Sequence, residues 1–115
     1  MNLHAYFIVF GSVQLLHSQE EIWTGFHKKW FVLTMPRWVF VSFEAILSAA
    51  IVTYLLGPHL LGAAAFSQWF IFAMLLNGMG HIIWAAIEKS YVPGLVTAPF
   101  FVLLFGVYYA NLVSA

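Results

Sequence analysis

The chain of 115 residues contains no cysteine, and only 7% of its residues are charged. The absence of cysteine excludes disulfide bonds, thiolate metal sites and thiol catalysis, so any bound metal must be held by nitrogen and oxygen. Four basic and four acidic side chains balance to a net charge of zero, which leaves no basic face for nucleic acid. Nucleic acid is therefore not expected as a partner.

Apolar residues form most of the chain. They make up 63% of the chain, and the mean hydropathy is +0.94, whereas soluble domains carry roughly 25% charged residues. This composition predicts an integral membrane protein. A chain of this length has room for about four spans of roughly 20 residues, so we expect residues 1–115 to form a single transmembrane domain.

Four apolar segments predict transmembrane helices at about residues 3–23, 38–56, 63–87 and 92–113. The links between them are short, which favours an all-α, up-down-up-down four-helix bundle. All four basic side chains lie in or beside the first and third links: Lys28, Lys29, Arg37 and Lys89. The positive-inside rule then predicts a multi-pass protein of the cell membrane with both termini outside the cytoplasm.

Polar residues gather at one predicted depth of this bundle. The stretch from His17 to Glu21 places an imidazole and two carboxylates at helical spacing on the first span. At a rise of 1.5 Å per residue, His17, Glu44 and His81 all fall roughly 10 Å below the cytoplasmic boundary, and Thr97 has a comparable depth. Ionisable groups inside a span are costly and usually mark a functional site.

Imidazoles and carboxylates from facing helices suit a divalent metal such as zinc, iron or manganese. We expect His17, Glu21 and His81 to be ligands, with Glu44 as a fourth ligand or as a group that orients the others. Glu20 is predicted to be nearer the interface, where it can act as a general base. Both Glu20 and Glu44 are therefore candidate catalytic residues.

The same polar layer has other uses. A protonated glutamate and a histidine could carry out metal-free acid-base chemistry, as in a lipid isomerase or cyclase. The layer could instead be structural and specify helix register in a non-catalytic membrane subunit or carrier. Heme held by His17 and His81 is less favoured, because carboxylates would face the apolar macrocycle and four short helices leave little lateral space.

Three sequence elements carry a family resemblance. His17-Ser18-Gln19-Glu20-Glu21 has the form HXXEE, a histidine follows an asparagine in Asn77-Gly78-Met79-Gly80-His81, and Tyr91-Val92-Pro93-Gly94 has the form Tyr-x-Pro-Gly. In these elements the chain resembles the small integral membrane proteins named for the HXXEE motif, an uncharacterised family. The resemblance implies functional roles for His17, Glu20, Glu21 and His81.

The sequence therefore predicts a metal-dependent membrane enzyme that acts on a lipid-like substrate, with membrane lipids as its surroundings. The proline and glycine of the third element are expected to reverse the chain between the last two spans. Assembly into a homo-oligomer or a larger membrane complex stays open.

Overall fold

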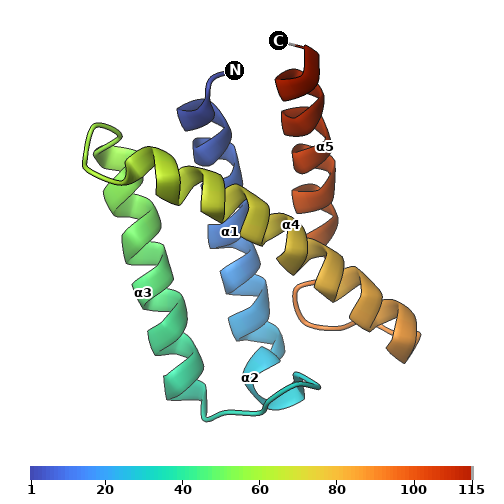
Figure 1. The fold of residues 1–115 in the computed structure, drawn as a ribbon. Helices are drawn as coiled ribbons and strands as arrows, with labels where there is room; N and C mark the ends of the chain where they lie inside the picture. Colours follow the sequence, from blue (N-terminus) through green and yellow to red (C-terminus); the bar gives the residue numbers. More distant parts are fainter. Residues whose placement is uncertain (115) are drawn as a thin grey trace.

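The computed structural model describes residues 1–114, and these residues form helices and connecting segments without a strand (Figure 1). The predicted all-α class is confirmed. The long helices run alternately down and up, so the two termini lie at the same end (Figure 1). In chain order the helices are α1 (Leu3–Thr24), α2 (Phe26–Lys29), α3 (Arg37–Leu56), α4 (Ala63–Glu88) and α5 (Ala98–Ser114).

The first three predicted spans match α1, α3 and α4 to within one residue at each end. Local sequence explains these boundaries. The side chain of Asn2 accepts a hydrogen bond from the backbone N–H of Ala5 and caps the start of α1. Gly25, with φ of 80°, ends α1 in the left-handed conformation that glycine favours. Pro36, which fixes φ and lacks an N–H, directly precedes α3.

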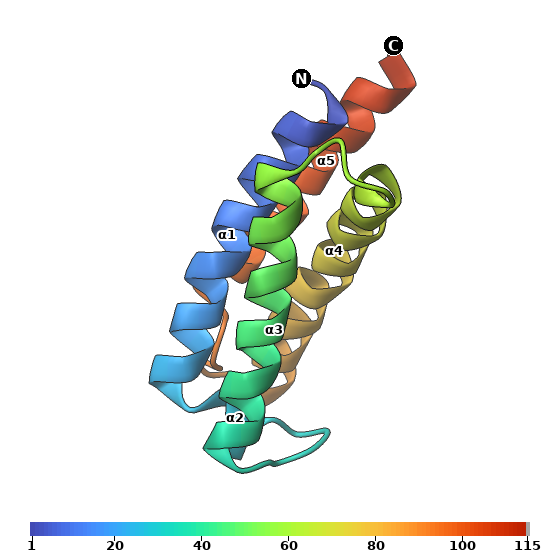
Figure 2. The same cartoon turned by 90° about the vertical axis from the view of Figure 1, so that its left-hand side faces the viewer.

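The prediction that the fourth helix begins at residue 92 is wrong, because α5 begins only at Ala98. The preceding residues form a turn in which Val92, Pro93 and Gly94 are buried. Gly94 has φ of 92°, a left-handed conformation that a right-handed helix cannot contain. This non-helical segment, residues 91–97, returns toward the lower half of α1 (Figures 1 and 2).

Helix α1 occupies the centre of the molecule. It packs against α3, α4 and α5, and α4 and α5 also pack closely together. Aromatic side chains fill the interface between α1, α4 and α5, where Phe7, Phe10, Phe70 and Phe101 are fully buried. Helix α3 packs mainly on α1, whereas α4 packs on α5 and α1, and the two helices diverge below the link that joins them (Figure 1).

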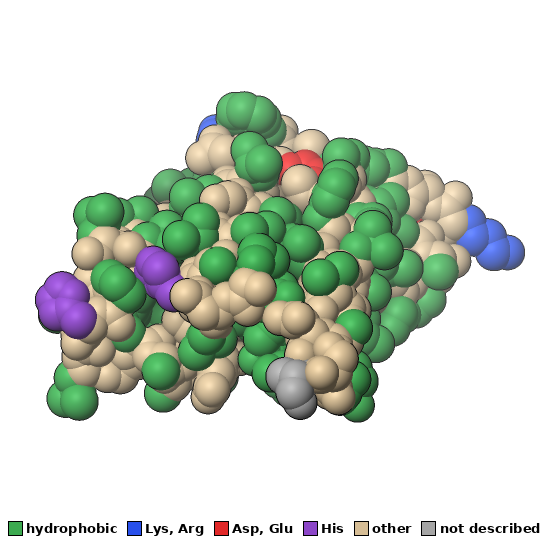
Figure 3. Space-filling view, turned by 90° about the horizontal axis from the view of Figure 1, so that it is seen from above, with side chains coloured by type: hydrophobic (Ala, Val, Ile, Leu, Met, Phe, Trp, Pro, Cys, Tyr) green, Lys and Arg blue, Asp and Glu red, His purple; other side chains and the backbone are tan. Residues whose placement is uncertain are grey.

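Apolar side chains also cover the outside of the molecule. Seen from the end that carries the termini, hydrophobic groups and backbone dominate the surface, and charged groups are few (Figure 3). Helices α3 and α4 are long and apolar enough to cross a membrane, whereas α5 is apolar but has 17 residues. Only 17% of the most apolar stretch of α3 and 33% of that of α4 is buried inside the molecule. Most of both stretches is therefore exposed on the surface of the molecule.

Two glycines on α4 provide a matched test of the packing. A Cβ at Gly78 would lie 2.7 Å from the carbonyl oxygen of Ala98 and 3.0 Å from Cβ of Phe101, whereas a Cβ at Gly80 would meet nothing within 4 Å. We expect Gly78→Ala to lower the free energy of unfolding by about 1–3 kcal/mol through overpacking between α4 and α5.

Gly80→Ala should have the opposite sign and raise the free energy of unfolding by about 0.5–1 kcal/mol, because it lowers the conformational entropy of the unfolded chain. Unfolding of both variants in detergent, followed by circular dichroism at 222 nm, measures the difference. Equal effects of the two substitutions would contradict the packing of α5 against Gly78.

Candidate metal centre

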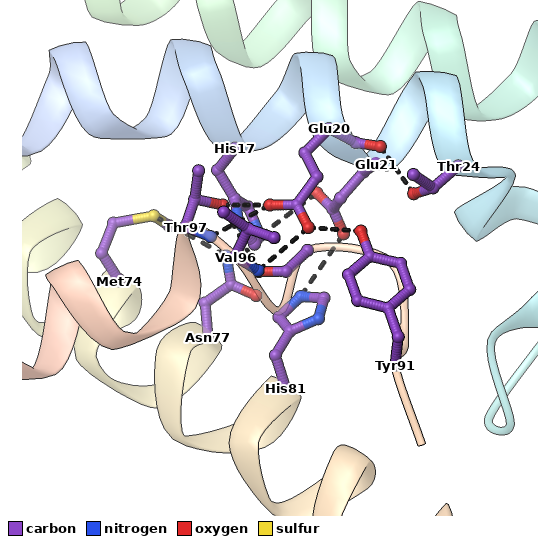
Figure 4. A network of polar contacts seen from close by, with 11 residues as sticks. His17, Glu20, Glu21, Thr24, Met74, Asn77, His81, Tyr91, Val96 and Thr97 are labelled. Carbon is purple, nitrogen blue, oxygen red and sulfur yellow. Dashed lines mark hydrogen bonds and ion pairs between the residues drawn. The ribbon is translucent and has the colours of Figure 1, made fainter.

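Three of the predicted ligands meet in the lower half of the molecule. His17 and Glu21 come from α1, one helical turn apart, and His81 comes from α4 (Figure 4). His17 Nε2 lies 3.4 Å from Glu21 Oε1, and His81 Nε2 lies 3.4 Å from Glu21 Oε2. One ligand atom from each residue lies within 4.8 Å of the other two. The exposed fractions of His17, Glu21 and His81 are 0%, 4% and 5%.

The imidazole nitrogens lie farther from the Glu21 carboxylate than direct hydrogen bonds would place them. An N–H···O hydrogen bond spans about 2.7–3.2 Å, and both nitrogen to oxygen distances here exceed that range. The two nitrogens face different oxygens of Glu21, and one ligand atom from each of the three residues lies within 4.8 Å of the other two. The cluster of His17, Glu21 and His81 could therefore hold a metal ion.

No basic side chain neutralises this cluster. The four lysine and arginine side chains of the chain are all exposed, and within residues 1–114 the ion pairs of Glu21 are to the two histidines alone. Burial of an ionised carboxylate without a counter-charge costs several kcal/mol. A cation bound between Glu21 and the imidazoles would supply the missing charge.

The Thr97 hydroxyl determines which nitrogen of His17 carries the proton. Thr97 Oγ1 lies 2.6 Å from His17 Nδ1 and 2.8 Å from Glu20 Oε1. A hydroxyl has one hydrogen to donate, and the carboxylate of Glu20 is a stronger acceptor than the carbonyl of Gly94 at 3.3 Å. Thr97 therefore donates to Glu20 and accepts from His17 Nδ1–H. In neutral His17, Nε2 then carries the lone pair, and this buried nitrogen has no hydrogen-bond partner among residues 1–114.

Glu20 binds the segment that precedes α5. Its carboxylate accepts from the backbone N–H groups of Val96 and Thr97, both at 3.0 Å, from the Thr97 hydroxyl and from the Tyr91 hydroxyl (Figure 4). A phenol hydroxyl is protonated at neutral pH and a carboxylate can only accept, so Tyr91 donates this bond. Four donors match the roughly four lone-pair sites of an ionised carboxylate.

Gly94 packs its backbone directly against the two imidazoles. A Cβ at this position would lie 2.7 Å from Cε1 of His17 and 2.6 Å from Cε1 of His81. The two rings meet edge to face, with their centroids 4.7 Å apart. The glycine of the Tyr-x-Pro-Gly element is therefore needed both for its positive φ and for the space that it leaves beside the histidines.

Glu44 is buried but lies outside the group of three ligands. Its role as a fourth ligand thus stays a prediction. Glu44 Oε2 has no hydrogen-bond partner within residues 1–114, and the same is true of Gln14 Oε1. Both side chains line one cavity with Glu21. The cavity therefore adjoins the cluster of His17, Glu21 and His81, because Glu21 belongs to both.

The sequence did not reveal all of these partners. A hydroxyl from Thr97 was expected at this depth, but the backbone N–H groups of Val96 and Thr97 were missed because both residues were assigned to a helix. The adjacent Pro93-Gly94 pair was the available signal, since a proline and glycine together favour a turn. Tyr91, the first residue of the Tyr-x-Pro-Gly element, also contacts Glu20.

The fold and the site define a small all-helical protein with a buried histidine and glutamate cluster. A family model described as "Protein of unknown function with HXXEE motif" matches residues 8–109. The chain therefore belongs to the HXXEE family, as the three sequence elements indicated. No curated protein and no solved structure matches the chain.

Replacement of Glu20 tests its contacts with residues 91–97. In Glu20→Gln, the NH2 group of the amide would face some of the N–H and O–H groups that now donate hydrogen bonds to the carboxylate. Those hydrogen bonds would be lost. We expect the free energy of unfolding to fall by about 2 kcal/mol, in line with hydrogen bonds to charged groups. Hydrogen exchange at the Val96 and Thr97 amides should become faster.

Glu88→Gln is the matched control, because Glu88 is exposed at the end of α4. This substitution should leave both unfolding and exchange at residues 96 and 97 unchanged. Unaltered protection of these two amides in Glu20→Gln would show that the carboxylate does not hold the segment.

Proposed function

We propose that this chain is an integral membrane metalloenzyme in which His17, Glu21 and His81 bind a divalent metal ion, and that it acts on a lipid-like substrate. The observation that carries the proposal is the meeting of two imidazoles and one carboxylate, all buried, with ligand atoms within 4.8 Å of one another. Burial of these groups without a basic partner is explained if a cation binds between them.

The exposed apolar surface supports a membrane location. Ile46 on α3 and Leu103 on α5 are 72% and 67% exposed, and water-soluble monomers rarely expose such surfaces over whole helices. The longest dimension of the Cα trace is 40 Å, enough to cross a hydrocarbon core of about 30 Å. We infer four spans: α1, α3, α4, and α5 with its preceding turn.

The positions of the basic residues support the inferred orientation. Lys28 and Lys29 lie on α2, Arg37 begins α3 and Lys89 follows α4. These places are at the end of the molecule opposite the two termini (Figure 1). By the positive-inside rule, the termini face away from the cytoplasm.

Three protein ligands are the usual set of a catalytic zinc site, which keeps a position for water or substrate. A metal bound in this way would polarise a substrate oxygen or activate a water molecule. Glu44, with an unpartnered oxygen beside the cavity, is the better placed of the two candidate catalytic glutamates for proton transfer. Glu20 acts through Thr97 on His17 and is a positioning residue.

The metal content of the purified protein tests the proposed metal centre. Protein purified in detergent without added chelator should contain close to one equivalent of zinc, iron or manganese, measured by plasma mass spectrometry. His17→Ala and His81→Ala should each reduce this content at least tenfold, because each removes one of three ligands. Circular dichroism of each variant verifies that the helices remain.

His59→Ala is the matched control, because His59 is exposed in the link between α3 and α4. Its metal content should equal that of the unaltered protein. If the unaltered protein contains no metal and takes none up on dialysis against zinc, iron or manganese, the metal centre is overturned. The acid-base and structural alternatives would then remain.

The hydrogen bond from His17 to Thr97 provides a subtler test. Removal of a group that orients a metal-binding histidine typically weakens metal affinity by about 10–100-fold. We expect Thr97→Val to weaken zinc affinity by about tenfold, measured by competition with a chromophoric chelator. Thr53→Val, which removes only a hydroxyl bonded to the Ala49 carbonyl, should leave the affinity unchanged. Equal affinities of the two variants would remove Thr97 from the site.

A further inference from the structure

A cavity of about 500 Å³ adjoins the metal cluster. It lies between α1, α3, α4 and the segment that follows α2, and its volume is within the range of about 300–1,000 Å³ typical of small-molecule sites. Nine apolar and four polar side chains line it. The apolar ones are Phe26, Trp30, Met35, Val39, Phe40, Phe43, Leu47, Trp69 and Met74, and the polar ones are Gln14, Glu21, Glu44 and Asn77.

The mouth of the cavity faces outward between α3 and α4. Phe43 on α3 and Trp69 on α4 both line the cavity, yet 61% and 58% of their surfaces are exposed. Residues that belong to a cavity wall and to the outer surface mark an opening. Because α3 and α4 pack on α1 rather than closely on each other, this opening would face the acyl chains of the membrane.

Two buried acceptor atoms in the polar wall of the cavity lack hydrogen-bond partners. Gln14 and Glu44 are 3% and 5% exposed, and Gln14 Oε1 and Glu44 Oε2 have no hydrogen-bond partner within residues 1–114. Buried acceptors without partners are costly, typically about 1–3 kcal/mol each. A bound molecule that donates hydrogen bonds to both would relieve this cost.

The charge of the lining restricts the bound molecule further. No lysine, arginine or histidine lines the cavity, whereas Glu21 and Glu44 do. A fatty acid or a lipid phosphate would therefore meet carboxylates and no positive charge. A neutral or cationic donor, such as a hydroxyl or an amine, matches the cavity, and the apolar wall matches a single hydrocarbon chain.

We propose that this cavity binds a single-chain amphiphile whose head group donates hydrogen bonds and carries no negative charge. The head lies at Gln14 and Glu44, next to Glu21, and the chain extends toward the mouth between Phe43 and Trp69. The proposal rests on the proposed function in that it names the substrate class of the metal centre. Glu21 belongs to both the metal cluster and the cavity wall, so the bound head group lies beside the metal.

Photo-crosslinking tests the proposal. The probe is a 12-carbon primary alcohol with a diazirine in its chain, added to the purified protein in detergent. Unlabelled dodecan-1-ol, dodecylamine and dodecanoic acid serve as competitors, and labelled peptides are mapped by mass spectrometry. We expect labelling at Phe43 and Trp69 that the alcohol or the amine displaces at concentrations at least tenfold lower than the acid. If the alcohol displaces the probe at a lower concentration than the amine, the head group is neutral. If the amine does so, the head group is cationic.

Gln14→Leu tests the polar wall, because leucine removes the acceptor at similar volume. It should weaken displacement by the alcohol about fivefold, the loss expected for one hydrogen bond. Gln68→Leu, on an exposed position of α4, is the matched control and should behave as the unaltered protein. Circular dichroism verifies that both variants are folded.

The proposal is overturned if the acid competes as well as the alcohol and the amine, or if labelling spreads over outward-facing residues such as Leu103 and no competitor displaces it. Repetition with chelator-treated protein separates this result from the metal test. Displacement that persists without metal supports the cavity even if metal content overturns the metal centre. Bound metal without selective displacement overturns the cavity proposal alone.

Discussion

The hydrogen bonds of the Glu20 carboxylate hold the rest of the site in place. Through them, α1 binds the non-helical segment 91–97 and satisfies two backbone N–H groups that no helix satisfies. The same contacts bring Gly94 against both imidazoles and Thr97 against His17. The position of the histidines and the tautomer of His17 thus depend on one carboxylate.

Two adjacent glutamates have opposite environments because they differ by about 100° on the helix. Glu20 receives four donors from the segment before α5 and is fully satisfied. Glu21 faces His17 and His81 at distances longer than hydrogen bonds. The two glutamates of the HXXEE motif therefore have different roles: Glu20 contacts Thr97, which bonds His17, and Glu21 could provide an oxygen to a cation.

Much of this arrangement could be predicted from residue spacing. The apolar segments located α1, α3 and α4 to within one residue, because long uniform hydrophobic stretches have clear ends. Equal depth of His17 and His81 predicted their meeting, since helices of constant rise bring such residues to one level. The start of α5 was misplaced, because hydropathy does not distinguish a buried turn from a helix. Glu44 shared that depth but lies outside the three-residue cluster.

The sequence by itself determined the all-helical class, the family and the residue types of the site, because periodicity and motif spacing are local properties of the chain. Only the tertiary structure decided which glutamate faces the histidines, which nitrogen of His17 is left without a proton, and where the cavity lies. These features depend on contacts between α1 and residues 91–97 and on the divergence of α3 from α4. Contacts between segments so distant along the chain leave no periodic signal in the sequence.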